Sequence, residues 1–410
     1  MQSHRRAVMS TVLFTVVVAM TASLILFLGS TAQAAGRSHG SASAKTRAVS
    51  PLGEVLASDA WPGADFGWSV AVSGSTAVVG APYANSYTGA AYVFTDSGGT
   101  WTQQAELTAG DGAPGDEFGW SVAISGSTVV VGAPDHYFGI GAAYVFSDSG
   151  GSWADQAELT PSGLGVTSEV KFGYSVVTSG AAIMVGADGY DAKAGAVFVF
   201  TDAGGTWNQE ATLTPADAGV GQEFGWSMAV SGPTLLVSAV KAHDDTGAVY
   251  VFSDAGGAWA QDAELTASDA AGNNYFGDKV AISGSRIVAG APGHDSEQGA
   301  AYVFTGSGAS WRQVAELTAS DGGPDDCFGW AVGVSGKTVL VGAEQTNADS
   351  GAAYMFTTTG SKWRQRAELA ANDGGTTDEF GYSASLSGTT AIIGADGAEA
   401  GAGSAFLYTL

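Results

Sequence analysis

The sequence predicts an all-β fold, a seven-bladed β-propeller built of four-stranded antiparallel blades. Three observations predict it. A Phe-Gly pair recurs seven times, at a spacing of 52 residues with one spacing of 54. Each repeat holds four strand-like segments separated by Gly-rich turns, and the two ends of the repeat region complement each other as the ends of a closed ring must. The repeats start near residues 66, 118, 172, 224, 276, 328 and 380.

The second repeat illustrates the four strands, which we expect at residues 121–124, 128–131, 142–146 and 153–160. The first three are mostly apolar and rich in β-branched and aromatic residues, which is typical of strands covered on both faces. The fourth strands alternate, as in WTQQAELT at residues 101–108, so that one face meets solvent. We therefore place the fourth strand at the outside of each blade, where its charges discourage edge pairing.

The ends of the repeat region predict how the ring closes. The seventh repeat stops after its third strand, whereas residues 52–57 align with the fourth strands of other repeats. The segments before the first and second Phe-Gly pairs both place an aspartate, Asp59 or Asp111, seven residues ahead of the Phe. We expect the N-terminal strand to complete the last blade, because a solenoid would need capping repeats instead.

The chain divides into three parts by composition. We interpret residues 1–34 as a signal peptide with a positive start, an apolar run and a cleavage site after Ala34. Residues 35–50 contain serine, glycine, arginine and lysine, and this composition predicts a disordered spacer. We expect residues 51–410 to form the propeller. The expected location is therefore secreted and extracellular. The alternative is an uncleaved N-terminal segment that anchors the propeller to a membrane.

Charge and cysteine content limit the partners. From residue 48 onward the chain has 10 basic and 40 acidic residues. Such a domain repels nucleic acid and anionic membranes, so we expect neither nucleic-acid binding nor membrane insertion after signal cleavage. The single cysteine, Cys327, excludes an internal disulfide. We expect a monomer.

The repeats resemble FG-GAP repeats, and the resemblance covers about residues 52–410. Repeats of this family build the seven-bladed propeller of integrin α subunits and of many secreted bacterial proteins. The resemblance therefore implies the same fold and, more weakly, a binding or adhesion module, because fold does not fix function. Besides the Phe-Gly pairs, it rests on Gly-Ala-Pro at residues 80–82, 132–134 and 290–292 and on GAAYVF starting at residues 89, 141 and 299.

The resemblance does not carry over the family's calcium sites. In calcium-binding integrin-type repeats the loop between the first and second strands has the sequence D-x-D-x-D-G. Here that loop is a Ser-Gly turn, as at residues 125–128 and 335–338, and it holds no carboxylate in any repeat. A Ca²⁺ site needs several oxygen ligands. We expect no cofactor and no metal site, and only weak surface binding of Ca²⁺ stays open.

Acidic residues gather in the loops of one face of the expected propeller. The loops from fourth strands to first strands lie on the same face as those between second and third strands, and we call this side the loop face. It holds 26 of the 40 acidic residues, no arginine and three lysines. Aspartates that cap turns account for Asp111, Asp321 and Asp373 but not for a whole face of one sign.

We predict that the loop face binds an unknown extracellular protein, a glycan or another cationic partner. The candidate ligand-binding residues are Asp116, Glu117, Asp135, Asp244, Asp245, Asp295, Asp325, Asp326, Asp378 and Glu379.

The residue after Phe-Gly is aromatic in six repeats and is Asp278 in the fifth. Near a propeller mouth such rings can stack on sugars, but we favour packing between blades because nearly every repeat has one. The aromatic residues are Trp68, Trp120, Tyr174, Trp226, Trp330 and Tyr382.

No catalytic residues stand out, and we expect no enzymatic activity. His136, His243 and His294 lie in loops between second and third strands, where histidine could bind metal or transfer protons. Their spacing matches no metal motif, so we expect them to be exposed loop residues. The alternative function is a propeller enzyme that acts on polysaccharide, which would concentrate unusual residues in two or three blades.

Overall fold

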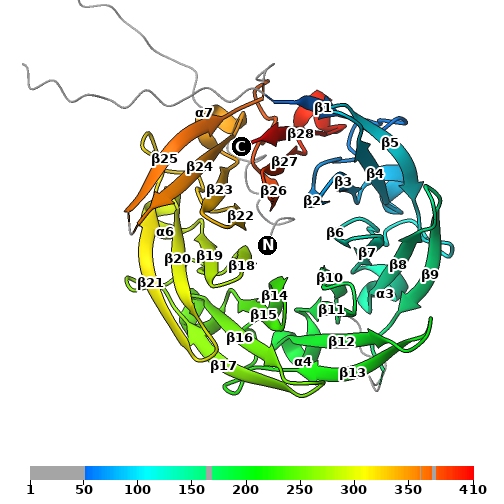
Figure 1. The fold of residues 1–410 in the computed structure, drawn as a ribbon, viewed down its shortest axis with the longest axis horizontal. Helices are drawn as coiled ribbons and strands as arrows, with labels where there is room; N and C mark the ends of the chain where they lie inside the picture. The colour runs from blue at the N-terminus through cyan, green and yellow to red at the C-terminus, as the bar shows by residue number, and fades with distance from the viewer. Residues whose placement is uncertain (1–50, 163–168, 361, 372–374) are drawn as a thin grey trace, which may run out of the picture. The chain divides into compact units, whose positions relative to one another are not determined.

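The computed structural model describes residues 51–162, 169–360, 362–371 and 375–410. These residues form seven four-stranded antiparallel sheets arranged as blades around a central axis (Figure 1). The predicted seven-bladed propeller is therefore confirmed. The expected signal peptide and spacer, and Asp373, lie outside the described residues. A search of the described part for a helix that is long and apolar enough to cross a membrane finds none.

Every blade has the same strand order, with its first strand next to the axis and its fourth strand outermost (Figure 1). The first strands are β2 (Ser69–Ser73), β6 (Ser121–Ser125), β10 (Phe172–Thr178), β14 (Phe224–Ser231), β18 (Val280–Ser283), β22 (Ala331–Ser335) and β26 (Ser383–Ser387). The second strands are β3 (Thr76–Ala81), β7 (Thr128–Ala133), β11 (Ala182–Ala187), β15 (Thr234–Ala239), β19 (Arg286–Ala291), β23 (Thr338–Ala343) and β27 (Thr390–Ala395). The third strands are β4 (Ala90–Asp96), β8 (Ala142–Asp148), β12 (Ala196–Asp202), β16 (Ala248–Asp254), β20 (Ala300–Ser307), β24 (Ala352–Thr359) and β28 (Ser404–Thr409). The fourth strands are β5 (Trp101–Leu107), β9 (Trp153–Leu159), β13 (Trp207–Leu213), β17 (Trp259–Leu265), β21 (Ser310–Leu317), β25 (Lys362–Leu369) and, for the last blade, β1 (Gly53–Val55).

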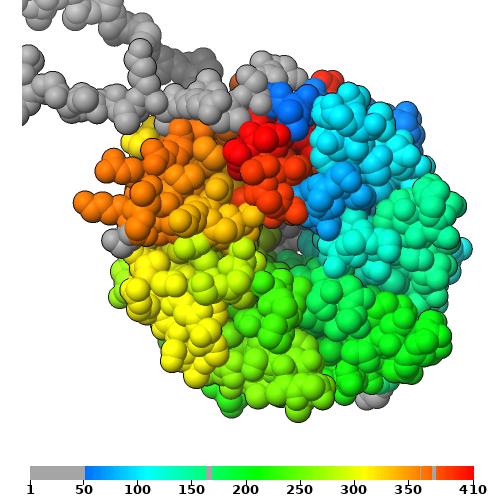
Figure 2. Space-filling model, viewed as in Figure 1, coloured from blue at the N-terminus to red at the C-terminus, as the bar shows by residue number. Residues whose placement is uncertain are grey.

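The burial of the strands follows the sequence patterns. In β7 all residues after Thr128 are buried, as expected of a strand covered on both faces. In β5 buried or half-buried residues alternate with exposed ones, as expected of an outermost strand. The first strands surround an axial channel of about 290 Å³ that is lined mainly by valine and alanine. The opening at the centre of the ring is visible in the space-filling view (Figure 2).

The ring is closed by the N-terminal strand, as the sequence predicts. Strand β1 pairs antiparallel with β28, with Glu54 opposite Phe406, so the last blade combines the two ends of the propeller. Val55 is 5% exposed and packs in the same apolar cluster as Phe66 and Tyr92 of the first blade. Closure therefore rests on both hydrogen bonds and apolar burial.

Phe-Gly pairs join each blade to the one before it. Phe118 is fully buried against Tyr144 and Phe146 of its own blade, at ring-centroid distances of 5.4 and 6.0 Å. Its backbone N–H donates to the carbonyl of Thr88 in the preceding blade at 3.0 Å, and it forms a parallel bridge with Gly89. The Phe118 side chain also belongs to the apolar cluster that contains Val78 and Val93 of the first blade, so it fills the space between the two blades while its backbone bonds to the preceding one.

The glycine of the pair allows this close approach. Gly119 has φ +95°, and a Cβ on it would lie 2.3 Å from the carbonyl oxygen of Ala90. Its own carbonyl accepts a hydrogen bond from the Ser69 hydroxyl of the preceding blade at 2.9 Å. The equivalent hydrogen bond closes the ring: the Ser383 hydroxyl of the last blade donates to the backbone carbonyl of Gly67 in the first blade at 2.6 Å. The Phe-Gly pair therefore has a structural role in joining the blades.

A short helical turn joins the second and third strands of every blade, which the sequence analysis did not predict. Each is four residues long, too short for a helical period to show in the sequence, and its second and third residues have positive φ. Because all seven blades share this conformation, it belongs to the architecture. The turns are α2 (Ala84–Tyr87), α3 (His136–Gly139), α4 (Tyr190–Lys193), α5 (Ala242–Asp245), α6 (His294–Glu297), α7 (Thr346–Asp349) and α8 (Ala398–Gly401).

Ring closure by β1 can be tested with neighbouring substitutions. Val55→Asp places a charge in the core shared by the last and first blades, and we expect it to lower the free energy of unfolding by roughly 3 kcal/mol or more. Leu56, next in the chain, is 43% exposed, so Leu56→Asp is the matched control and should change stability by less than about 0.5 kcal/mol. Chemical denaturation followed by circular dichroism measures both, and equal effects would contradict this role of β1.

Candidate functional site

Backbone hydrogen bonds connect the loops of neighbouring blades on the loop face. The N–H groups of Gly115 and Glu117, in the loop that enters the second blade, both donate to the carbonyl of Tyr87 in α2 at 3.0 Å. In the next blade Lys171 donates to the carbonyl of Gly139 in α3 at 2.9 Å. The two sets of loops therefore share one face, as predicted, and the face is a continuous surface.

Three of the predicted site residues hold the backbone of their own loops. Asp116, Asp326 and Asp378 each lie two residues before a Phe-Gly pair. Each carboxylate accepts a hydrogen bond from the backbone N–H three residues earlier, at 2.6–2.7 Å. Asp116 and Asp378 are buried and Asp326 is half-buried. These side chains fix the approach to each Phe-Gly pair rather than extending into solvent.

The structure corrects the turn-capping role that we expected for Asp111. Its Oδ1 accepts a hydrogen bond from the hydroxyl of Tyr144 in β8 at 2.9 Å. Asp217 accepts one from Tyr250 in β16 at 3.2 Å. Burial and Asp111 raise the pKa of Tyr144 above its usual range, so the phenol remains a donor. The aspartate seven residues before Phe thus anchors its loop to the third strand.

Glu117, Asp135 and Lys171 form a compact charged group between the second and third blades. Lys171 forms an ion pair with Asp135. Burial, followed by the neighbouring Asp135 carboxylate, raises the pKa of Glu117 to about 8. The structure brings these two predicted site residues together, but most of their charge is compensated within the group.

Exposed carboxylates form an arc over five consecutive blades. The predicted residues Asp244, Asp295 and Asp325 are exposed, and Asp245 and Glu379 are half-buried. Each helical turn of the third to seventh blades carries one exposed acidic side chain at least. We define the acidic arc as Asp191, Asp244, Asp295, Asp349 and Glu399, which lie on α4, α5, α6, α7 and α8.

The first and second blades carry aromatic side chains where the other blades carry the acidic arc. We define this aromatic patch as Tyr87, Tyr137 and Phe138, whose exposed fractions are 55%, 52% and 96%. Phe138 has φ +62°, a conformation that is unfavourable for a bulky residue. The patch lies outside the predicted site residues, although HYFG in α3 differs visibly from AHDD in α5.

The aromatic residues after Phe-Gly form a belt around the mouth of the channel. Trp68 contacts Trp120 of the next blade and Tyr382 of the last blade, with ring centroids 4.7 and 4.9 Å apart. Tyr174 and Trp226 continue the belt at 4.9 Å. Since the rings pack on one another across blades, the inter-blade packing that we favoured is confirmed.

Three acidic residues beside this belt are buried. Asp188, Glu344 and Asp396 follow the Gly-Ala pair of the third, sixth and seventh blades, and their exposed fractions are 8%, 5% and 1%. Burial, followed by repulsion from Glu223, raises the pKa of Asp188 from its usual value near 3.8 to about 7. Burial and the Glu379 carboxylate likewise raise the pKa values of Glu344 and Asp396 well above the usual range. These groups favour the protonated form and add little charge to the loop face.

His136 corrects the expectation that the loop histidines are exposed, because it is 2% exposed. It is the first residue of its helical turn, and the equivalent Ala84, Ala242 and Ala398 are also buried. The first position of these turns therefore faces inward. His294 occupies the same position and is half-buried, whereas His243 is the second residue of α5 and is exposed.

Each of the three histidines lies beside an aspartate from the preceding loop and a glutamate from the fourth strand of its own blade. Within each group the three ligand atoms are within 4.8 Å of one another. The glutamates are not predicted from the sequence, because their approach to histidine depends on how the fourth strand pairs with the third, as in Tyr144 opposite Glu158. The groups are Asp111–His136–Glu158, Asp217–His243–Glu264 and Asp269–His294–Glu316.

Comparison with known proteins identifies the repeats. A family model described as FG-GAP repeat matches more than half of the chain, at residues 52–94, 101–146, 207–252, 259–304, 311–356 and 363–408. The chain belongs to the FG-GAP repeat family. Most of these matches run from a fourth strand to the third strand of the next blade, and the first begins at the ring-closing segment. No curated protein is significantly similar to this FG-GAP propeller. FG-GAP propellers are in general binding or adhesion modules.

The pKa of Asp188 predicts a pH-dependent stability. The folded protein raises this pKa from about 3.8 to about 7, so the favourable protonated state is fully present below pH 4 and is lost as the pH rises to 7. Asp188→Asn should remove this loss and stabilise the protein at pH 7 by as much as about 4 kcal/mol relative to its effect at pH 4. Urea denaturation at several pH values measures the difference.

Asp191→Asn is the control, since Asp191 is exposed and only three residues away. Its stability should follow the pH dependence of the unaltered protein. If the stability of Asp188→Asn shows the same pH dependence between pH 4 and 7 as the unaltered protein, the buried Asp188 carboxyl does not destabilise the fold as the pH rises.

Proposed function

We propose that this FG-GAP propeller is an exported binding module whose loop face binds a basic segment of a partner protein. The observation that supports the proposal most directly is the acidic arc on α4 to α8, which adjoins the aromatic patch of α2 and α3 around the ring. A partner with positive side chains next to an apolar one would complement both parts of this surface.

The electrostatics of the acidic arc favour a positive partner. The basic side chains of the loop face are largely used within it, because Lys171 pairs with Asp135 and Lys241 lies 2.6 Å from Glu223. The arc residues are exposed, and no ion pair within the described part of the chain involves them. A field of one sign over several blades steers oppositely charged partners toward the surface and raises their association rate.

The aromatic patch provides the apolar part of the proposed contact. Exposed aromatic side chains that gather on neighbouring loops are typical of interaction sites, and aromatic residues contribute a large share of binding energy at interfaces. Phe138 is almost completely exposed in an unfavourable backbone conformation. Its side chain contributes nothing to the core, so a role in binding accounts for it best.

Export supports an extracellular partner. The leader at residues 1–34 has the charge, apolar run and small residues of a signal peptide. Cleavage after Ala34 would release the module, whereas an uncleaved leader would hold the same loop face at a membrane surface. In both cases the partner is met outside the cytoplasm.

A labelled peptide that alternates lysine and leucine provides the test. Replacing Asp191, Asp244, Asp295 and Asp349 together by asparagine should weaken its binding about tenfold or more and flatten the salt dependence. The control is the double substitution Asp155→Asn and Glu210→Gln, which removes exposed charges from the outer strands β9 and β13 and should leave binding nearly unchanged. Fluorescence anisotropy at 50 and 300 mM salt measures both.

Phe138→Ser tests the apolar part of the surface. It should lower the affinity for the same peptide severalfold without changing the salt dependence of binding. Equal binding by the unaltered protein, the four-residue variant and the outer-strand control would contradict the proposed function. Release of sugar from a polysaccharide by the purified protein would favour the enzymatic alternative instead.

A further inference from the structure

His136 is held in one orientation by a carboxylate. Its Nδ1 lies 2.7 Å from Oδ2 of Asp116, which also accepts the backbone N–H of Ala113 at 2.7 Å. A carboxylate only accepts hydrogen bonds, so Nδ1 carries the proton and donates it to Asp116. In the neutral imidazole, Nε2 then presents its lone pair. A carboxylate that orients histidine in this way is a common support for metal ligands in proteins.

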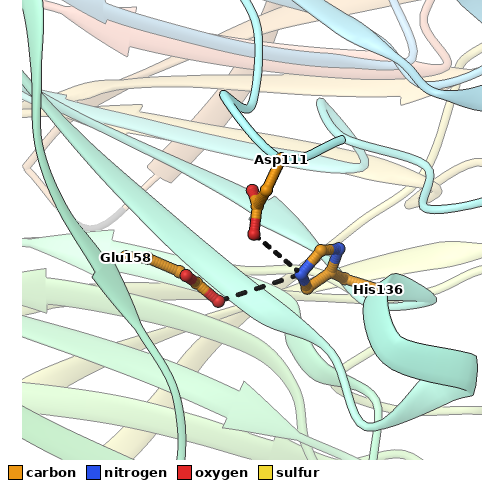
Figure 3. Close-up of side chains that lie close together, drawn as sticks. All are labelled: Asp111, His136 and Glu158. Atoms are coloured by element: carbon orange, nitrogen blue, oxygen red, sulfur yellow. Dashed lines mark ion pairs between the residues drawn. The ribbon is translucent and has the colours of Figure 1, made fainter. Parts of the chain in front are cut away.

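The Nε2 atom of His136 points toward two further carboxylates (Figure 3). It lies 3.4 Å from Oδ2 of Asp111 and 3.8 Å from Oε1 of Glu158. The histidine side chain is 3% exposed, and Nε2 is buried with no hydrogen-bond partner within the described residues. A lone pair and two negative oxygens that face one another repel, so a positive charge between them would stabilise the arrangement.

We propose that Asp111, His136 and Glu158 bind a divalent transition-metal ion of the Zn²⁺ type. Zinc bonds to imidazole nitrogen and carboxylate oxygen are about 2.0–2.2 Å long, and tetrahedral angles then separate neighbouring ligand atoms by roughly 3.3–3.6 Å. The separation of 3.4 Å lies in this range, that of 3.8 Å lies slightly above it, and all three ligand atoms lie within 4.8 Å of one another, so small side-chain movements would bring them to the metal. The ligands come from three elements: the loop before the second blade, α3 and β9.

The donor set selects the type of ion. One imidazole and two carboxylates suit Zn²⁺ and Mn²⁺, whereas Ca²⁺ takes six to eight oxygen ligands. The site is also distinct in place from the loops between first and second strands, which here are short Ser-Gly turns. The carboxylate side chains of Asp111 and Glu158 are 42% and 32% exposed, so a fourth coordination position is open to water or to a ligand from a partner.

Contacts from two tyrosines hold the site in place before any ion arrives. The Tyr144 hydroxyl donates to Oδ1 of Asp111, and the Tyr137 hydroxyl donates at 3.4 Å to Oδ2, the oxygen that faces His136. The Tyr137 ring packs on the imidazole, with centroids 3.8 Å apart, and covers it from solvent. Ligand atoms that are already oriented lose less entropy on binding.

The fourth and fifth blades contain the same three ligand types but lack the orienting aspartate. Nε2 of His243 lies 2.6 Å from Glu264, and Nε2 of His294 lies 3.2 Å from Asp269, so each imidazole nitrogen already has a carboxylate partner. The orienting Asp116 is replaced by Gln222 and Asn274 in these blades. We therefore assign the tight site to the second blade and expect weaker binding in the other two.

Zinc titration of the full propeller tests the proposal. Protein stripped of metal with a chelator is titrated with Zn²⁺ in a calorimeter, with and without excess Ca²⁺. We expect one tight site that Ca²⁺ does not displace. Glu158→Gln should weaken this site at least tenfold, and Asp116→Asn should weaken it about tenfold because the histidine loses its orienting charge. His294→Ala is the matched control and should retain the tight site.

The absorption spectrum of bound Co²⁺ provides a second readout. A tetrahedral site with nitrogen and oxygen ligands gives visible bands, and these should be absent in His136→Ala and present in His294→Ala. Glu158 lies on an outer strand, so Glu158→Gln should unfold at the same temperature as the unaltered protein when no metal is added. The proposal is overturned if Zn²⁺ binds equally to the unaltered protein and to Glu158→Gln, or if Ca²⁺ displaces it.

Discussion

Each Phe-Gly pair is in close contact with the preceding blade, and this contact sets the position of every blade in the ring. The glycine backbone lies so near the neighbouring strands that no Cβ fits, and the phenylalanine next to it is buried in the apolar cluster between the two blades. A serine hydroxyl from the preceding first strand completes the contact at Gly119 and at Gly67. Since Gly67 belongs to the first blade and Ser383 to the last, the same interaction that joins neighbours also closes the ring.

This constraint separates architecture from function along the repeat. The second and third strands cannot vary much, because their side chains point alternately into the apolar clusters shared with the blades on either side. Variation is free only at the outer strand and on the loop face, where the helical turns, the preceding loops and the residue after Gly-Ala differ from blade to blade. The acidic arc, the aromatic patch and the group around His136 all lie at these variable positions, and none disturbs the contacts of a Phe-Gly pair.

The fold could be predicted from the sequence because its determinants are local and repeated. Residues 52–57 could be placed in the last blade by alignment alone, and the Ser-Gly turn excluded a calcium loop. The site could be predicted only in part. The position of Asp116 is visible in the sequence, but its hydrogen bonds to Ala113 and His136 arise from the folded loop. Likewise, Glu158 reaches His136 only because of the strand pairing within the blade, and burial gives Asp188 a raised pKa that no linear pattern records.

Substitution of two glycines in one blade shows whether the Phe-Gly contacts hold the ring together. Gly119 has φ +95° and no room for a Cβ, whereas Gly126 in the Ser-Gly turn has φ +59° and nothing within 4 Å of the place that a methyl group would take. If Phe-Gly contacts hold the ring together, Gly119→Ala lowers the free energy of unfolding by about 3 kcal/mol or more, and Gly126→Ala by only about 1 kcal/mol. Equal losses for the two variants, measured by chemical denaturation, would contradict the account.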